Sequence, residues 1–141
     1  FDMKKTIIRN LNPYDAAEEL RNDESAILID VRSEIEFTYV GHPINSTNIP
    51  WKLLPENSIN PDFVSNVKNL LENTGGNRLD RPVFLICRSG ARSASAADKL
   101  AHTGYTNLTN IEEGFEGEIN QDGHRGKING WRFRRLPWRQ S

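Results

Sequence analysis

Two short runs of apolar residues, 26–29 and 82–86, most constrain the fold of this chain. Neither run alternates apolar with polar residues, and such runs are typical of strands that are covered on both faces, as parallel strands are. Parallel strands need crossover connections, and the segments between the runs have the apolar spacing of helices. The sequence therefore predicts an α/β fold with a mainly parallel sheet and right-handed crossovers.

Capping and turn signals divide the chain into alternating strands and helices. Asn12 before Pro13 predicts a helix start, and the Asn60-Pro61 pair repeats the signal. Ser33 and Glu36 have the spacing of a capping box for a short helix that ends near Tyr39. The expected strands are residues 6–8, 26–29, 46–49, 82–86 and 107–111, and the expected longer helices are 13–22, a segment beginning at 61, and 92–103.

Composition indicates one domain spanning residues 1–141, since no repeat or linker divides the 141 residues. The net charge of −1 combines an acidic body with a basic aromatic tail, residues 121–141, which is expected to pack on the body. The apolar runs are too short to span a membrane, which needs about 20 residues. The tail has no base-reading module, so no nucleic-acid partner is predicted.

Cys87, the single cysteine, follows the second apolar run and precedes a predicted helix. Loop amides and a helix N-terminus stabilise an anion, and Arg88 and Arg92 add positive charge. Such surroundings favour the thiolate, the nucleophilic form of cysteine. A lone cysteine at a strand end is in many proteins only a small buried hydrophobe. The two arginines and Gly90 instead indicate a nucleophile for an anionic substrate.

No metal site or cofactor is predicted. One cysteine makes neither an internal disulfide nor a cysteine-based zinc site. His42, His102 and His124 are scattered and lack the spacing of metal ligands.

Residues 86–93, Ile-Cys-Arg-Ser-Gly-Ala-Arg-Ser, resemble the active-site loop of single-domain rhodaneses, a family of sulfurtransferases. The resemblance extends to residues 28–32, which contain Asp30 and Arg32, and to residues 41–43 and 114–117, so it covers nearly the whole chain.

This resemblance implies a rhodanese-like, doubly wound, five-stranded parallel sheet flanked by helices. It also implies that Cys87 takes a sulfane sulfur from a small anionic donor such as thiosulfate, holds it as a persulfide, and passes it to a thiol or cyanide. A thioredoxin-like or sulfur-relay protein is the corresponding protein partner. Asp30 and Arg32 are expected to support the site structurally. The residues expected to bind the substrate are Arg88, Ser89, Gly90, Ala91, Arg92 and Ser93.

Two other functions stay open at this point. The chain could be a non-catalytic persulfide carrier or a redox-sensing module, or it could be a cysteine-dependent phosphatase or arsenate reductase of the same fold. The span from Cys87 to Arg92 is one residue shorter than the phosphatase loop, and Ile86 stands where phosphatases carry histidine. The cytoplasm is the expected compartment, because a free reactive thiol suits a reducing environment. The protein is expected to be a monomer. The start at Phe1 leaves a processed secretory precursor as the alternative.

Overall fold

Five parallel strands form the central sheet of the computed structural model, which describes residues 6–141. Their order is β1-β8-β7-β2-β4, and all four neighbouring pairs are parallel. The strands are β1 (Arg9–Leu11), β2 (Ile27–Asp30), β4 (Ser46–Asn48), β7 (Val83–Ile86) and β8 (Leu108–Ile111). The two apolar runs therefore become the adjacent strands β2 and β7 at the middle of the sheet.

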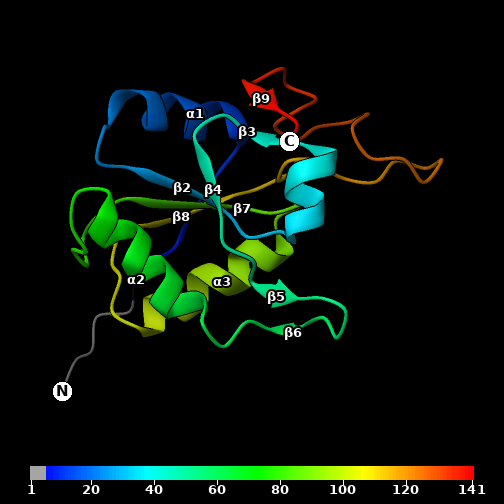
Figure 1. The fold of residues 1–141 in the computed structure, drawn as a ribbon. Coiled ribbons are helices and arrows are strands. Elements are labelled where there is room, and N and C mark those ends of the chain that lie inside the picture. The colour runs from blue at the N-terminus through cyan, green and yellow to red at the C-terminus, as the bar shows by residue number, and fades with distance from the viewer. Residues whose placement is uncertain (1–5) are drawn as a thin grey trace.

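Helices cover both faces of this sheet, as Figure 1 shows. α1 (Pro13–Asn22) lies on one face together with the tail, and α2 (Phe63–Asn73) and α3 (Ala91–His102) lie on the other. This arrangement confirms the predicted doubly wound α/β fold. The predicted cap of α1 is also confirmed, because the Asn12 side chain accepts a hydrogen bond from the Asp15 N–H at 2.9 Å.

Each central strand contributes to two apolar cores, one on each face. In β2, Leu28 packs in the core beneath α1, whereas Ile29 packs in the core beneath α2 and α3. In β7, Phe84 packs in the core beneath α1, and Leu85 packs in the core beneath α2 and α3. Because successive side chains of a strand point to opposite faces, a strand between two helical layers must be apolar at every position.

Three predicted elements differ from those observed in type or by more than one residue. The first strand is residues 9–11 and not 6–8, because the register with β8 pairs Arg9 with Thr109 and leaves Ile7 82% exposed. The second long helix begins at Phe63, since the Asn60 side chain accepts the Asp62 N–H at 3.0 Å and forms a turn there. The short helix after Ser33 is the π-helix η1 (Glu36–Val40).

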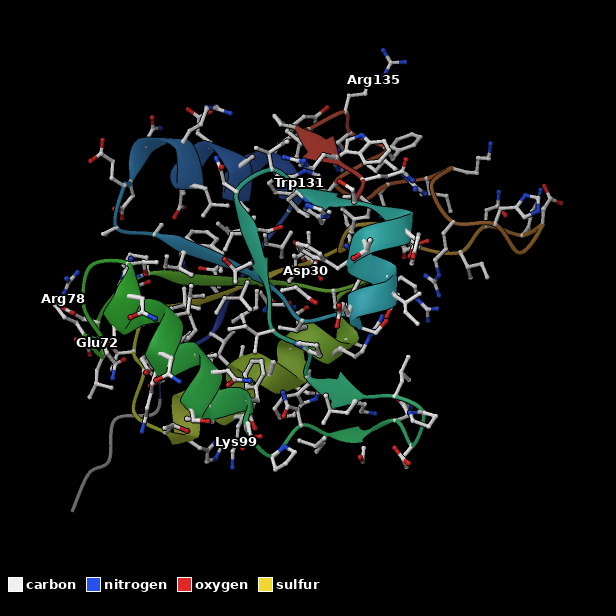
Figure 2. The ribbon with its side chains drawn as sticks, in the orientation of Figure 1. Asp30, Glu72, Arg78, Lys99, Trp131 and Arg135 are labelled. Carbon is white, nitrogen blue, oxygen red and sulfur yellow. The ribbon has the colours of Figure 1, made fainter. Side chains whose placement is uncertain are left out.

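Two antiparallel ribbons complete the structure, and neither was predicted from the sequence. β5 (Lys52–Leu53) pairs with β6 (Ser58–Ile59), and β3 (His42–Pro43) pairs with β9 (Trp138–Arg139). Trp131 is 4% exposed in the core beneath α1, and Figure 2 places it on that side of the sheet. Its backbone N–H donates to the Gly114 carbonyl at 2.9 Å.

Within residues 6–141 we find no helix that is both long and apolar enough to cross a membrane.

Candidate active site

Cys87 lies directly after β7, at the carboxyl edge of the sheet, and is 1% exposed. It borders a cleft of about 420 Å³. Clefts at this edge are the usual ligand sites of open α/β sheets. Beside Cys87, the cleft is lined by Glu36, Lys52, Leu54, Asn57, Arg88, Ser89, Ala91 and Arg92. Of the predicted substrate-binding residues, Gly90 and Ser93 do not line the cleft, but both contact the Cys87 sulfur.

The loop after Cys87 turns back toward the sulfur atom. The Gly90 N–H donates to Cys87 Sγ at 3.1 Å, and Gly90 has a φ of 110°, a left-handed conformation that favours glycine. α3 begins at the next residue, so its N-terminal N–H groups open toward this loop. Within residues 6–141, five backbone N–H groups of the loop have no hydrogen-bond acceptor: those of Arg88, Ser89, Ala91, Arg92 and Ser93. These donors are available to an anion.

The segment that follows β8 fixes the loop from behind. The Phe115 N–H donates to the Cys87 carbonyl at 2.8 Å, and the N–H groups of residues 116 and 117 donate to the Arg88 carbonyl at 3.0 and 3.1 Å. Because the C=O and N–H of a trans peptide point in opposite directions, the N–H groups of residues 88 and 89 point away from this segment. A Cβ on Gly114 would lie 2.5 Å from the Arg88 carbonyl, so this close approach requires glycine.

An ion pair between Arg92 and Glu36 forms one wall of the cleft. Two bonds of 2.8 Å join the guanidinium to the two carboxylate oxygens. Ser33 donates to Glu36 Oε1 through its N–H and its hydroxyl, at 3.1 and 2.9 Å, so the expected capping contact is present. Burial raises the pKa of Glu36, but Arg92 and Ser33 outweigh it and bring that pKa to about 2. The hydrogen bonds that Arg92 donates to Glu36 in turn raise the pKa of Arg92, against the effect of burial.

Two other cations of the cleft have no ion pair within residues 6–141. Arg88 is exposed at its rim, and Lys52 extends from the β5–β6 ribbon. The same ribbon supplies Leu54 and Asn57 as an outer wall. Because Glu36 already neutralises Arg92, Arg88 and Lys52 give the cleft its positive charge.

Asp30 and Arg32 form a fully buried ion pair that does not line the cleft. Arg32 Nη2 donates to Asp30 Oδ2 at 2.6 Å and to the Gly41 carbonyl at 2.5 Å. The Arg32 guanidinium also lies 4.6 Å from the centre of the Phe115 ring. Figure 2 shows Asp30 in the middle of the molecule, at the end of β2. The pair therefore reaches Cys87 indirectly, through Phe115 and its bond to the Cys87 carbonyl.

The site residues that sequence reasoning missed are Glu36, Lys52, Leu54, Asn57 and the segment 114–117. Glu36 was visible as a capping residue, and residues 114–117 as a motif, but neither signal indicated contact with the cysteine loop. The ribbon lies about thirty residues before Cys87 and carries no motif.

Comparisons with known proteins agree on one family. The model of the rhodanese-like domain family matches residues 13–120. An uncharacterized protein of Rickettsia prowazekii is 34% identical over 134 residues, 94% of this chain and 98% of that protein. The thiosulfate sulfurtransferase GlpE of Pseudomonas putida is 29% identical over 104 residues, 74% of this chain and 79% of that protein. The crystal structure of Rv0390 from M. tuberculosis matches with a TM-score of 0.82 at 34% identity, covering 96% of this chain and 100% of that chain.

Proposed function

The chain belongs to the rhodanese-like domain family, and on this premise we propose that it is a sulfurtransferase that carries a sulfane sulfur on Cys87. The observation that supports this most directly is the position of the Cys87 sulfur. It lies 3.1 Å from the Gly90 N–H, beside a loop whose other N–H groups have no acceptor in the part of the chain that the structure describes. Such a ring of donors stabilises a negative charge on an atom attached to the sulfur.

The proposed reaction has two displacements. The Cys87 thiolate attacks the outer sulfur of thiosulfate, a new S–S bond forms, and the S–S bond of thiosulfate breaks with its electron pair leaving on sulfite. The outer sulfur of the persulfide then carries the negative charge. An acceptor nucleophile, cyanide or a thiolate, attacks that outer sulfur, and the Cys87 thiolate leaves with the electron pair. No net oxidation of the protein occurs over the cycle.

Each part of the cleft has a role in this scheme. The N–H groups of residues 88–93 hold the charged outer sulfur, and the N-terminus of α3 adds its partial positive charge. Arg88 and Lys52 draw the anionic donor into the cleft, because neither is neutralised by an ion pair within residues 6–141. The single cysteine offers no internal thiol to displace the sulfur, so the sulfur must leave to another molecule.

The primary test is the intact mass of the protein after incubation with thiosulfate. We expect a gain of one sulfur atom that cyanide removes and that the Cys87→Ser variant lacks. Absence of that gain with thiosulfate and with an organic persulfide would overturn the proposal.

A second measurement separates an enzyme from a passive sulfur carrier. Continuous release of thiocyanate from thiosulfate and cyanide is expected, and Arg88→Ala should raise the KM for thiosulfate. Arg78→Ala is the matched control, since Arg78 is exposed and lies at the opposite end of the molecule from the cleft (Figure 2). A protein that loads sulfur but never turns over would be a carrier.

The phosphatase alternative is less well supported by the geometry of Arg92. A phosphatase arginine must offer its guanidinium to the phosphate oxygens. Here two bonds of 2.8 Å engage that group with Glu36. Hydrolysis of p-nitrophenyl phosphate that depends on Cys87 would nevertheless favour this alternative over sulfur transfer.

A further inference from the structure

A chain of polar side chains runs from Cys87 through the buried Ser93 and Asn110 to the exposed Asn10 on the edge strand β1, and most of it has no role in the scheme above. Ser93 Oγ lies 3.2 Å from Cys87 Sγ and 2.5 Å from Asn110 Oδ1. Asn110 Nδ2 then donates to Asn10 Oδ1 at 3.0 Å and to the Gly90 carbonyl at 3.3 Å. Ser93 is fully buried and Asn110 is 4% exposed, and both side chains find hydrogen-bond partners among protein groups.

The orientation of the Asn110 amide follows from one of its partners. The Gly90 carbonyl can only accept, so the NH₂ group of Asn110 must face it, and Oδ1 must face Ser93. The Ser93 hydroxyl has a single proton and three acceptors within reach, since the Gly90 carbonyl also lies 3.2 Å away. Asn110 Oδ1 is the nearest of these acceptors, so it takes the proton.

This geometry suits a Cys87 sulfur that does not need the Ser93 proton. With a thiol, the S–H donates to Ser93 Oγ and every group in the chain is satisfied. With a free thiolate, the Ser93 hydroxyl must turn to the sulfur, and within residues 6–141 nothing else donates to Asn110 Oδ1. With a persulfide, the charge lies on the outer sulfur, so the Ser93 proton returns to Asn110.

We propose that Asn110 is a positioning residue that holds the Ser93 hydroxyl and thereby weakens the stabilisation of the free Cys87 thiolate relative to its sulfur-loaded form. The part that concerns the loaded form rests on the proposed sulfur transfer. Asn110 does not line the cleft; its Oδ1 acts on the sulfur through Ser93, and its Nδ2 also bonds the Gly90 carbonyl of the cysteine loop. A less stabilised thiolate is a stronger nucleophile, so this arrangement favours uptake of sulfur.

The charged groups around Cys87 do not contact Asn110 and stay constant in the test. They come from the cysteine loop and α3, from η1, from β5 and from the end of β2. The residues are Arg88, Arg92, Glu36, Lys52 and Asp30.

The first test is a titration of the thiolate absorbance near 240 nm in Asn110→Leu, a change that keeps the branching at Cγ but removes the acceptor. Cys87→Ser supplies the blank, and the single cysteine makes the signal unambiguous. We expect half-titration at a pH lower by about half to one unit, because a hydrogen bond to a charged sulfur is stronger than one to a neutral group. Asn110→Ala serves the same purpose if the leucine variant does not fold.

A double-mutant cycle separates this role from a general structural effect. In a Ser93→Ala background, the substitution of Asn110 should no longer move the titration. Asn10→Ala is the matched control, since it removes one partner of Asn110 but leaves the Gly90 carbonyl to fix the amide. An equal shift in the Ser93→Ala background or in Asn10→Ala, or no shift in either Asn110 variant, would overturn the inference.

Sulfur loading provides the second readout. At a pH above the half-titration point of both proteins and at a fixed ratio of thiosulfate to sulfite, the ratio of loaded to free Cys87 in Asn110→Leu should fall about threefold to tenfold, since the free thiolate is stabilised. An unchanged ratio would contradict the part that concerns the loaded form. If even the unaltered protein takes up no sulfur, the proposed function fails, whereas the titration still decides the role of Asn110.

Discussion

The Arg92–Glu36 ion pair makes the stability of this protein depend on pH, and one substitution isolates its contribution. Each carboxylate oxygen of Glu36 accepts a bond of 2.8 Å from Arg92, and 24% of the Glu36 side chain is exposed. These contacts bring the pKa of Glu36 to about 2 from an ordinary value of 4.5. In the unfolded chain the contacts are absent and the ordinary value applies.

A lowered carboxyl pKa stabilises the folded state when the group is ionised. The difference between 4.5 and about 2 corresponds to about 3 kcal/mol at neutral pH. The contribution is complete above pH 4.5, the ordinary value, and is lost as the pH falls through about 2. Glu36→Gln keeps an acceptor for Ser33 but removes the charge. It should therefore lower the free energy of unfolding by about 2–3 kcal/mol at neutral pH, and by about half as much near pH ~3.

The assay is urea unfolding of both proteins at a series of pH values, followed by the fluorescence of the buried Trp51 and Trp131. Glu34→Gln is the matched control, because Glu34 is exposed and makes no ion pair within residues 6–141. It makes the same change in net charge, and its effect should stay within about 0.5 kcal/mol at every pH. The reasoning would be refuted by a Glu36→Gln effect no larger than that of Glu34→Gln, or by one that does not shrink in acid.

Three further predictions concern the groups that hold the cysteine loop. Gly114→Ala should destabilise the fold by about 2 kcal/mol or more and slow sulfur loading, because its Cβ would overlap the loop backbone. Urea unfolding and loading rates measure these effects. Gly123→Ala is the control, since Gly123 also has a positive φ but has open space around it. Asp30→Ala should cost about 3–5 kcal/mol in urea unfolding, because it leaves a buried guanidinium unpaired. Glu113→Gln should weaken the pair with Arg134. Burial raises the pKa of Glu113, but the hydrogen bonds from Arg134 and the Gly130 N–H bring that pKa below its ordinary value. The loss of stability should therefore be greater at neutral pH than in acid, as urea unfolding at both pH values would show.

Much of the fold was predictable because β2 and β7 lie between two helical layers. That position requires apolar residues on both faces, and an unalternating run is a signal that depends on no distant contact. The same reasoning placed Cys87 at the carboxyl edge of the sheet, where its loop and α3 supply donors. The first strand was misplaced because residues 6–8 are as rich in β-branched residues as a strand, and only the register with β8 decides which residues pair.

The rest of the candidate site depends on contacts between segments far apart in the chain. Glu36 and Arg92 are 56 residues apart, and the capping contact of Glu36 with Ser33 explained that carboxylate locally without reference to the loop. Asn110 is a buried polar residue in a strand, a position that propensity alone disfavours. Its role becomes visible only when α3 places Ser93 beside it.

The segment 114–117 shows why a residue can belong to an anion site without facing it. A loop that offers its N–H groups to an anion must direct its carbonyls to the other side, and those buried carbonyls need donors. The Phe115 N–H and its two successors supply them to Cys87 and Arg88. The tail then fixes this segment, because Trp131 donates to the Gly114 carbonyl. The basic aromatic tail is therefore coupled to the Cys87 loop through backbone hydrogen bonds, independently of any effect of its charge on substrates.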